Sequence, residues 1–438
     1  MKDSARIAAG IEILDEVFGC AASAELLLRR YLRARRYIGS KDRKSIQELV
    51  FGVIRHRGFL EWRLGQAGSQ EIEAADLARR MTIAYLALSV GPNRGRTGAE
   101  CSALFDDAKY APAPLTPDEQ GLIDALTSGE APRPEAMPDW ARLNYPAWLD
   151  GTLKASLKDD FEAEMAALNA QAPVDLRVNL IKATRDQALA ELIGAGVDAT
   201  PTRLSPWGIR ISERTPWGNL APYRAGLIEP QDEGSQILAL VADARPGQTI
   251  VDLCAGAGGK TLAMGALMNN EGRIIATDSA RDRLSRTASR LARAGVKNAE
   301  IVTDIDTVYR DYAGKADRVL ADCPCSGSGT WRRQPAARWC LTQATLSDHL
   351  RTQQTLLDRA AGLVKPGGRL IYATCSLLEC ENSDQAKWFD KHAPGFRNLD
   401  MHDIWEAPGD GAAAPYLSLT PARHETDGVF AAVWERIS

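Results

Sequence analysis

Five strand-like segments separated by helical patterns and turns alternate through the second half of the chain. The segments are QTIVDL, GRIIATD, AEIVTD, DRVLAD and RLIYATC, which begin at residues 248, 272, 299, 317 and 369. Parallel strands need helical crossovers, so this alternation predicts a doubly wound parallel sheet of the Rossmann-like α/β class. Ligands bind in this class where the strands end, which makes the residues after each segment candidates for function.

The rest of the chain predicts two smaller domains before this sheet. A length of 438 residues is expected to give about three domains. Residues 1–130 predict a helical domain, because Ile7 and Leu14 share one helical face and Thr116 to Glu119 form a capping box. The further divisions are a proline-rich linker at 131–145, a small α+β module at 146–230 with a strand at 175–181 and a helix capped by Thr184 and Gln187, and the sheet domain at 231–438.

The composition limits where the protein works. The first residues scatter Asp3, Glu12 and Asp15 where a signal peptide needs an apolar stretch, and no apolar run approaches a membrane span. We therefore expect a cytoplasmic protein without membrane contact. The net charge of −4 argues neither for nor against a nucleic acid as partner.

Eight cysteines and five histidines could in principle form disulfides or a metal site. No C-x-x-C pair occurs and a cytosolic chain is kept reduced, so we expect all eight cysteines to be free. The histidines lack ligand spacing, so we expect no metal. Inert packing is the interpretation for Cys20, Cys101, Cys340 and Cys380.

The first strand of the predicted sheet runs into a glycine-rich turn, DLCAGAGGKT at 252–261. A P-loop would need glycine at Cys254, and the dinucleotide fingerprint would want glycine or alanine at Thr261. The remaining pattern is that of S-adenosylmethionine: Asp252 at the strand end, a loop of small residues, and Asp278 about 20 residues later to accept from the ribose hydroxyls. Asp304 ends the third strand and could reach the adenine. The alternative for each aspartate is a helix cap.

DCPCSGSG at 322–329 and TCS at 374–376 end the fourth and fifth strands. Taken alone, DCPC is open to a metal site, a disulfide, a nucleophile or chance. Methyltransferase sheets place these two strands side by side, about 4.8 Å apart. Cys325 and Cys375 should therefore face one another beside the methyl donor.

Two thiols beside a methyl donor suit methylation of a pyrimidine at carbon-5. A thiolate that adds to carbon-6 makes carbon-5 nucleophilic, after which the carbon-5 proton is removed and the thiolate is eliminated. Asp322 could hold the ring at N3 and the exocyclic amine. Amine methyltransferases show Asn/Asp-Pro-Pro-Tyr/Phe after the fourth strand, and the thiols in its place favour carbon as the target.

These motifs resemble the RNA cytosine-5 methyltransferases, most closely the bacterial 16S ribosomal RNA methyltransferase B (Fmu/Sun) type. The resemblance covers nearly the whole chain, and residues 42–57 are similar to the NusB-like RNA-binding domain of that type. The segments that carry it are QDEGSQ, DLCAGAGGKT, Asp278 with Arg283-Leu284, Asp304, DCPCSGSGTWRRQP, KPGGRLIYATCSLLECEN and ETDGVF.

The resemblance implies roles for individual residues. Cys375 would attack the base, Cys325 would assist product release and Asp322 would complete the catalytic set. The implied contacts to S-adenosylmethionine are Cys254, Ala255, Gly256, Ala257, Gly258, Gly259, Lys260, Asp278, Arg283, Asp304 and Asp322. This chain departs from the family in Gly256-Ala257, where Ala-Pro is usual, and in Cys323, which is most simply a small buried residue.

RNA, in particular ribosomal RNA, is the implied partner, and we expect a monomer. Half of residues 29–44 are Lys or Arg, with Tyr31 and Tyr37 between them, a pattern that can bind phosphates and stack on bases. The alternative for this run is a solvated helix face. The residues expected to hold neighbours of a flipped base are Trp331, Arg332, Arg333, Arg338 and Trp339, and the alternative for the two tryptophans is a place in the core. Alternatives are the same chemistry on tRNA, a NusB-like RNA-binding regulator with an inactive methyltransferase domain, and a P-loop ATPase.

Overall fold

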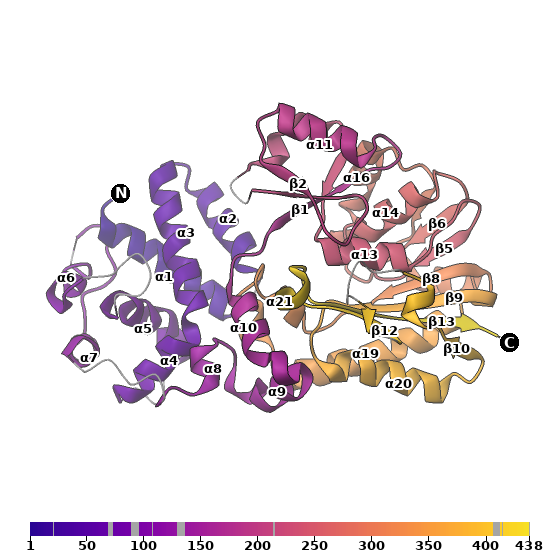
Figure 1. Ribbon diagram of the computed structural model, residues 1–438. Helices are drawn as coiled ribbons and strands as arrows, with labels where there is room; N and C mark the ends of the chain where they lie inside the picture. Colours follow the sequence, from indigo (N-terminus) through magenta and orange to yellow (C-terminus); the bar gives the residue numbers. More distant parts are fainter. Residues whose placement is uncertain are drawn as a thin grey trace. The chain divides into compact units, whose positions relative to one another are not determined.

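The computed structural model describes residues 1–20, 22–68, 73–88, 96–106, 108–128, 136–212, 215–405, 412–413 and 415–437. The chain forms two compact units (Figure 1). The first contains Met1–Lys154 and Trp331–Gln343, and the second contains Ala155–Thr330 and Ala344–Ser438. Residues 131–135 of the predicted linker lie outside the described residues, and α8 (Asp139–Arg142) occupies part of its remainder.

The first unit is helical, as the apolar periodicity predicts. Its helices are α1 (Asp3–Phe18), α2 (Ala24–Ala34), α3 (Ser40–Arg55), α4 (Arg57–Gln66), α5 (Ala74–Ala87), α6 (Gly98–Ser102), α7 (Pro117–Ser128), α8 and α18 (Ala337–Cys340). Ile7 and Leu14 of α1 are buried in its core. The predicted capping box starts α7, where the Glu119 backbone N–H donates to Thr116 Oγ1 at 3.2 Å and Thr116 N–H donates to Glu119 Oε2 at 2.9 Å. The NusB-like character of this unit stays a prediction.

The expectation that all eight cysteines are free was wrong. Cys20 and Cys340 form a disulfide across 320 residues of sequence, with their Cα atoms 5.7 Å apart. That expectation rested on the absence of a C-x-x-C pair and on a reducing cytosol. Neither argument shows that α18 brings Cys340 to the end of α1. The other six cysteines are free.

The segment 331–343 packs into the first unit and buries three of its large side chains. Trp331, Arg332 and Arg338 are buried. Arg338 Nη1 donates to the Asn144 carbonyl at 2.6 Å, and its guanidinium lies 5.1 Å from the Trp331 ring centroid. Burial lowers the pKa of Arg338 to about 9. Packing thus explains these three residues, and the expectation that they face a flipped base's neighbours was wrong for them. For the half-buried Arg333 and Trp339 it stays a prediction.

The second unit begins with the predicted small α+β module. The strands β1 (Val174–Val178), β2 (Ala199–Pro201), β3 (Gly208–Ile211) and β4 (Ile228–Pro230) pair in the order β2-β3-β1-β4, and α11 (Arg185–Gly194) packs on them. The predicted cap of α11 is present: Gln187 N–H donates to Thr184 Oγ1 at 3.3 Å and Thr184 N–H donates to Gln187 Oε1 at 2.9 Å. The helices before this module are α9 (Asp150–Leu157), which spans the boundary between the units, and α10 (Phe161–Asn169).

The large sheet has the predicted Rossmann-like core. All five predicted segments are strands that pair in parallel: β5 (Thr249–Asp252), β6 (Arg273–Ala276), β7 (Ala299–Ile301), β8 (Ala316–Asp322) and β9 (Val364–Thr374). From β5 the chain adds β6 and β7 on one side, and it then returns to add β8 and β9 on the other side. The strand order β9-β8-β5-β6-β7 therefore has its switch point between β5 and β8, as in doubly wound folds. Ile250 packs into one core layer and Val251 into the other, so both faces are covered.

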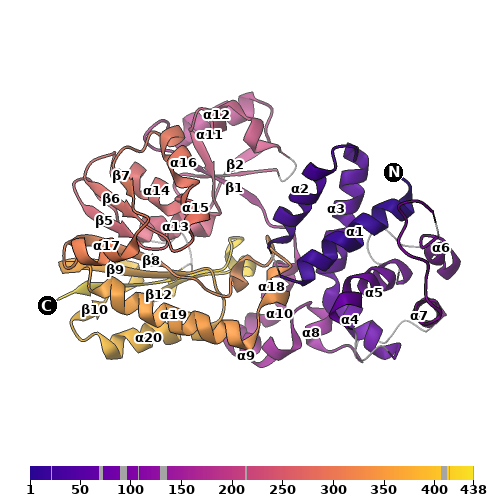
Figure 2. The ribbon, with the colours of Figure 1, turned by 180° about the vertical axis from the view of Figure 1, so that it is seen from behind.

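Helices cover both faces of this sheet (Figure 2). On one side lie α13 (Glu233–Val241) and α14 (Gly259–Leu267), and on the other lie α19 (Gln343–Ala361) and α20 (Ser383–His392). The remaining helices of this region are α15 (Arg281–Leu284), α16 (Thr287–Ala294), α17 (Ile305–Asp311) and α21 (Pro421–His424).

The sheet is mixed, although the sequence pattern predicted only parallel strands. β13 (Val429–Arg436) pairs antiparallel with β9, and β12 (Tyr416–Leu419), β11 (Ala412–Ala413) and β10 (Phe396–Asn398) extend this edge. These strands lack the strand-to-helix alternation on which the prediction rested. No helix among the described residues is long and apolar enough to cross a membrane.

Candidate active site

The glycine-rich loop joins β5 to α14 through two residues in the left-handed region. Gly256 and Gly258 have φ of 55° and 79°. A Cβ on Gly258 would lie 2.5 Å from Thr287 Cγ2, so only glycine fits there without movement. Asp278, which follows β6, holds this loop: its Oδ2 accepts from the Gly256 backbone N–H at 2.7 Å, and its Oδ1 accepts from Ala280 N–H at 2.6 Å.

A hollow of about 190 Å³ opens where these strands end. Its lining residues are Gln231, Ser235, Asp252, Cys254, Ala255, Ala257, Gly259, Lys260, Arg283 and Asp322. Most of the implied cofactor residues thus surround one space. Asp278 borders the loop without lining the hollow, and the exposed Asp304 caps α17, accepting from Asp306 N–H at 3.2 Å and Thr307 Oγ1 at 2.9 Å. For Asp304 the structure shows the alternative role, a helix cap.

Asp252 is the most deeply buried acid of the hollow. Its Oδ2 accepts from Thr261 Oγ1 at 2.7 Å, whereas its Oδ1 has no hydrogen-bond partner among the described residues. Burial raises the pKa of Asp252 to about 7, although the nearby Lys260 lowers it. A ligand that donates a hydrogen bond or carries positive charge would satisfy this oxygen.

Lys260 and Asp322 form an ion pair between the loop and the end of β8. Lys260 Nζ lies 2.6 Å from Asp322 Oδ2, and the lysine side chain is 12% exposed. Burial lowers the pKa of Lys260, but the charges of Asp322, Asp252 and Cys375 outweigh it and raise the pKa overall. A positive charge is therefore held beside the thiols.

The two catalytic-candidate thiols meet at the ends of adjacent strands. β8 and β9 are parallel, with Asp322 opposite Ala373, and Cys325 Sγ lies 3.5 Å from Cys375 Sγ. The hydrogen bond to Cys375, burial and the charges of Cys375 and Glu381 raise the pKa of Cys325 well above its usual value. Cys325 is thus kept as a thiol that can share its proton with Cys375. Cys323 is buried in the core, as expected.

Glu381 joins the two thiol-bearing loops, and the sequence analysis assigned it no role. The side chain is fully buried. It accepts from Ser326 N–H at 2.8 Å, Ser326 Oγ at 2.5 Å, Ser376 Oγ at 2.5 Å and Gln353 Nε2 at 3.2 Å. Ser326 follows Cys325 and Ser376 follows Cys375, so one carboxylate fixes both loops. The available signal was the acid in ECEN, within a segment that the family resemblance already covers.

Comparisons with known proteins agree with this site. A family model described as 16S rRNA methyltransferase RsmB/F matches residues 239–435, and a model of the ferredoxin-like domain of RsmF/B-like methyltransferases matches residues 145–217. The ribosomal RNA small subunit methyltransferase B of Citrobacter koseri is 30% identical over 409 residues, which are 90% of each chain. The chain belongs to the RsmB/F family. It is an RNA methyltransferase, as the motifs predicted.

Solved structures support the fold of this RsmB/F family member. The crystal structure of PH0851 is 25% identical, covers 100% of this chain and 99% of its own, and has a TM-score of 0.81. NSun6 from Pyrococcus horikoshii, solved with SFG, is 21% identical, with a TM-score of 0.59 over 67% of this chain and 98% of its own. The second likeness concerns the fold alone.

The Glu381 network predicts a large stability effect. Glu381→Ala leaves the buried Ser326 N–H without an acceptor and removes the acceptor that the Ser326 and Ser376 hydroxyls share, and should lower the free energy of unfolding by about 2–4 kcal/mol. The matched control is Glu379→Ala, which removes an exposed ion pair with Lys158 (3.1 Å) and should cost at most about 1 kcal/mol. Urea unfolding measures both, and equal losses would contradict the assignment.

Asp252 predicts a pH dependence of stability in the cofactor-free protein. Its pKa of about 7 lies above the usual value, so the folded protein holds a proton that the unfolded chain has lost. Stability should therefore fall as pH rises from about 4 to about 7. Asp252→Asn should reduce this fall by on the order of a few kcal/mol. Urea unfolding at several pH values checks it, and parallel curves for the two proteins would show that Asp252 is ionised throughout.

Proposed function

We propose that this enzyme methylates carbon-5 of a cytosine in 16S ribosomal RNA, with S-adenosylmethionine as the methyl donor and a cysteine adduct at carbon-6. The main support for this proposal is the thiol pair Cys325–Cys375, whose sulfur atoms lie 3.5 Å apart at the ends of adjacent strands. The Lys260–Asp322 ion pair lies at the end of the same strand β8. The small-subunit ribosomal RNA named for the Citrobacter koseri relative favours that substrate over tRNA.

The residues of the hollow fit S-adenosylmethionine. Its ammonium group could donate to the unpartnered Oδ1 of Asp252, and the glycine loop lines the hollow through Ala255, Ala257 and Gly259. Asp278 has acceptor capacity beyond its two backbone partners and would take the ribose hydroxyls. When bound, the cofactor supplies an electrophilic methyl group. Asp304 caps α17 and, like Asp278, has acceptor capacity beyond its two partners, so it stays in the proposed set as a contact to the adenine.

In this proposal Cys375 is the nucleophile and Cys325 the acid–base partner. The Cys375 thiolate forms a bond to carbon-6 of the cytosine, and electron density moves to carbon-5, which takes the methyl group. Water then takes the carbon-5 proton, and the electron pair of that bond re-forms the ring double bond while the sulfur–carbon-6 bond breaks and the Cys375 thiolate leaves. Cys325 is suited to assist this release by donating a hydrogen bond to the departing Cys375 sulfur, because the hydrogen bond between the thiols, burial and nearby negative charge raise the pKa of Cys325.

Asp322 and Lys260 would hold the base. Asp322 is an acceptor for the exocyclic amine and for a protonated N3, which stabilises the ring as charge shifts during addition. Lys260 Nζ contacts Asp322 Oδ2 at 2.6 Å and so fixes the position of the carboxylate at the end of β8. Asp322, Asp252 and Cys375 together raise the pKa of Lys260, so the ammonium charge is retained in the site.

The domain roles complete the proposal. The helical residues 1–130 would act as a NusB-like RNA-binding domain, and residues 146–230 would bind RNA beside the methyltransferase domain at 231–438, in a monomeric enzyme. An inactive regulator would have no need for the paired thiols and the buried Glu381.

The cofactor assignment predicts a loss of affinity. Asp278→Ala removes the proposed ribose contact and the support of Gly256, so S-adenosylmethionine binding should weaken by about 1.5–3 kcal/mol. Asp306→Ala, an exposed acid on α17, is the control and should bind normally. Calorimetry measures both. Unchanged affinity in Asp278→Ala would remove this residue from the site.

The thiol assignment predicts opposite behaviour of the two cysteines. Cys375→Ala should abolish methylation and any covalent protein–RNA complex, because no bond to carbon-6 can form. Cys325→Ala should still attack but fail to release, so the adduct should accumulate. Denaturing gels with labelled 16S RNA and S-adenosylmethionine separate these outcomes. An adduct in Cys375→Ala and none in Cys325→Ala would reverse the roles, and full activity in both would refute thiol catalysis.

A further inference from the structure

The first unit contains a groove of about 790 Å³ that lies far from the cofactor residues in sequence. Helix α1 forms one wall, and residues of α2, the turn that follows it and the segment 109–111 form the rest. Its lining residues are Met1, Lys2, Ala5, Ala8, Ala9, Glu12, Tyr31, Arg35, Tyr37, Ile38, Lys109, Tyr110 and Ala111.

Exposed aromatic rings distinguish this groove. Tyr37 is 75% and Tyr110 is 72% exposed. Within the described part of the first unit, four large apolar side chains are exposed, and three of them, Met1, Tyr37 and Tyr110, line this one groove; Leu26 does not. Tyr110 also has a φ of 74°, a conformation that costs energy for a residue with a side chain. The fold therefore keeps the exposed Tyr110 in a backbone conformation of raised energy.

The charges of the groove are mainly positive. The lining contains three cations, Lys2, Arg35 and Lys109, and one carboxylate, Glu12. Glu12 accepts hydrogen bonds from Tyr31 Oη at 2.8 Å and from Arg35 Nη2 at 3.2 Å. The Arg35 guanidinium lies over the Tyr31 ring at 3.6 Å. Lys109 Nζ lies 5.0 Å from the Tyr110 ring centroid, and neither Lys2 nor Lys109 has an ion-pair partner within the described ranges. The N-terminal ammonium is paired with Asp42 at 3.0 Å.

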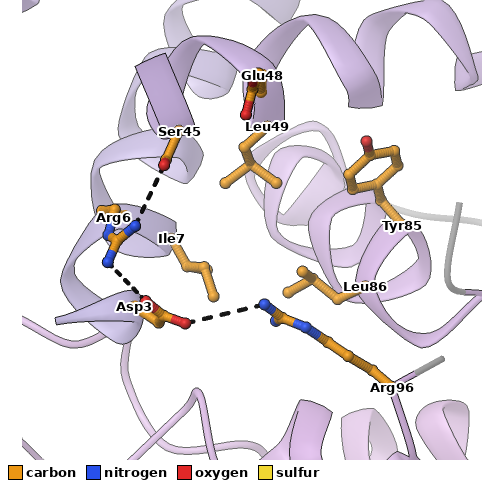
Figure 3. A pocket seen from close by; sticks show the side chains of 9 residues that line it. All are labelled: Asp3, Arg6, Ile7, Ser45, Glu48, Leu49, Tyr85, Leu86 and Arg96. Atoms are coloured by element: carbon orange, nitrogen blue, oxygen red, sulfur yellow. Dashed lines mark hydrogen bonds and ion pairs between the residues drawn. The ribbon is translucent and has the colours of Figure 1, made fainter. Parts of the chain in front are cut away.

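A second hollow on another face of α1 lacks these properties (Figure 3). Its arginines, Arg6 and Arg96, both point to Asp3, with nitrogen–oxygen distances of 2.8 and 4.0 Å. Glu48 adds a further carboxylate to the lining of this hollow. The one aromatic residue of the lining, Tyr85, is buried. Cations paired within the protein leave little charge for phosphates, so this hollow is not a comparable candidate.

We propose that the groove binds a single-stranded segment of the substrate RNA, with bases stacked on Tyr37 and Tyr110 and phosphates beside Lys2 and Lys109. The inference rests on the proposed function, because it takes RNA as substrate. Single strands are favoured over duplex because an exposed ring stacks only on a base that has left its own stack. Residues far apart in sequence build the site, and the basic run 29–44 supplies only one side of it.

The test uses the full chain and a 12-nucleotide oligoadenylate, with an RNA duplex of equal length as the second probe. Tyr37→Ala and Tyr110→Ala should each weaken oligoadenylate binding by about 5- to 150-fold, the range for loss of one stacked base. Tyr37→Phe should stay within about twofold of the wild type, because a phenyl ring still stacks. The matched control is Leu26→Ala, which removes an exposed apolar side chain outside the groove.

Two further readings locate the contact. Lys109→Ala should lower the slope of log affinity against log salt by about 0.7, the value for one single-strand phosphate. An oligonucleotide carrying 4-thiouridine should crosslink to peptides that contain Tyr37 or Tyr110. The inference is overturned if both alanine variants bind oligoadenylate like the wild type, or if they lose duplex binding equally. Thermal melting confirms that each variant is folded.

Methyl transfer from labelled S-adenosylmethionine to 16S RNA separates this inference from the proposed function. No transfer by the wild type would refute the proposed function while the binding results still decide the groove. Normal transfer together with unchanged binding in both tyrosine variants would refute the groove alone.

Discussion

The parallel pairing of β8 with β9 is the interaction on which the site depends. Asp322 lies opposite Ala373 in this pairing, so the loops that leave the two strands start side by side. The thiols of Cys325 and Cys375 come from positions 50 residues apart and meet at 3.5 Å. A register shift of one residue would turn every side chain at these strand ends to the other face of the sheet and separate the pair.

Buried charges then keep this arrangement in a single state. Glu381 accepts hydrogen bonds from the residue after each thiol, and Lys260 joins the glycine loop to Asp322. A buried carboxylate is costly unless its oxygens are satisfied, and Glu381 has four donors to satisfy them. After the hydrogen bond to Cys375 and burial, the charge of Glu381 also raises the pKa of Cys325, so the group that holds the loops also acts on a thiol of the site.

The chain passes between its two units directly after the candidate catalytic loop. Thr330 is the last residue of that loop in the second unit, and Trp331 is the first of a segment that belongs to the first unit. Within the first unit this segment is anchored by the burial of Trp331, by Arg338 and by the disulfide from Cys340 to Cys20. The helical unit, with its proposed RNA groove, is thus covalently continuous with the thiol loop at the Thr330–Trp331 bond.

Local patterns in the sequence determined the parallel core, the capping boxes at Thr116 and Thr184, the glycine loop and the two thiol motifs, because each depends on spacing within a short segment. The family resemblance added roles that spacing left open, such as which thiol attacks. Glu381, the antiparallel strand β13, the Cys20–Cys340 disulfide and the burial of Arg338 were decided only by the tertiary structure. Each depends on partners distant along the chain, and sequence periodicity reports which face of an element is buried but not what covers it.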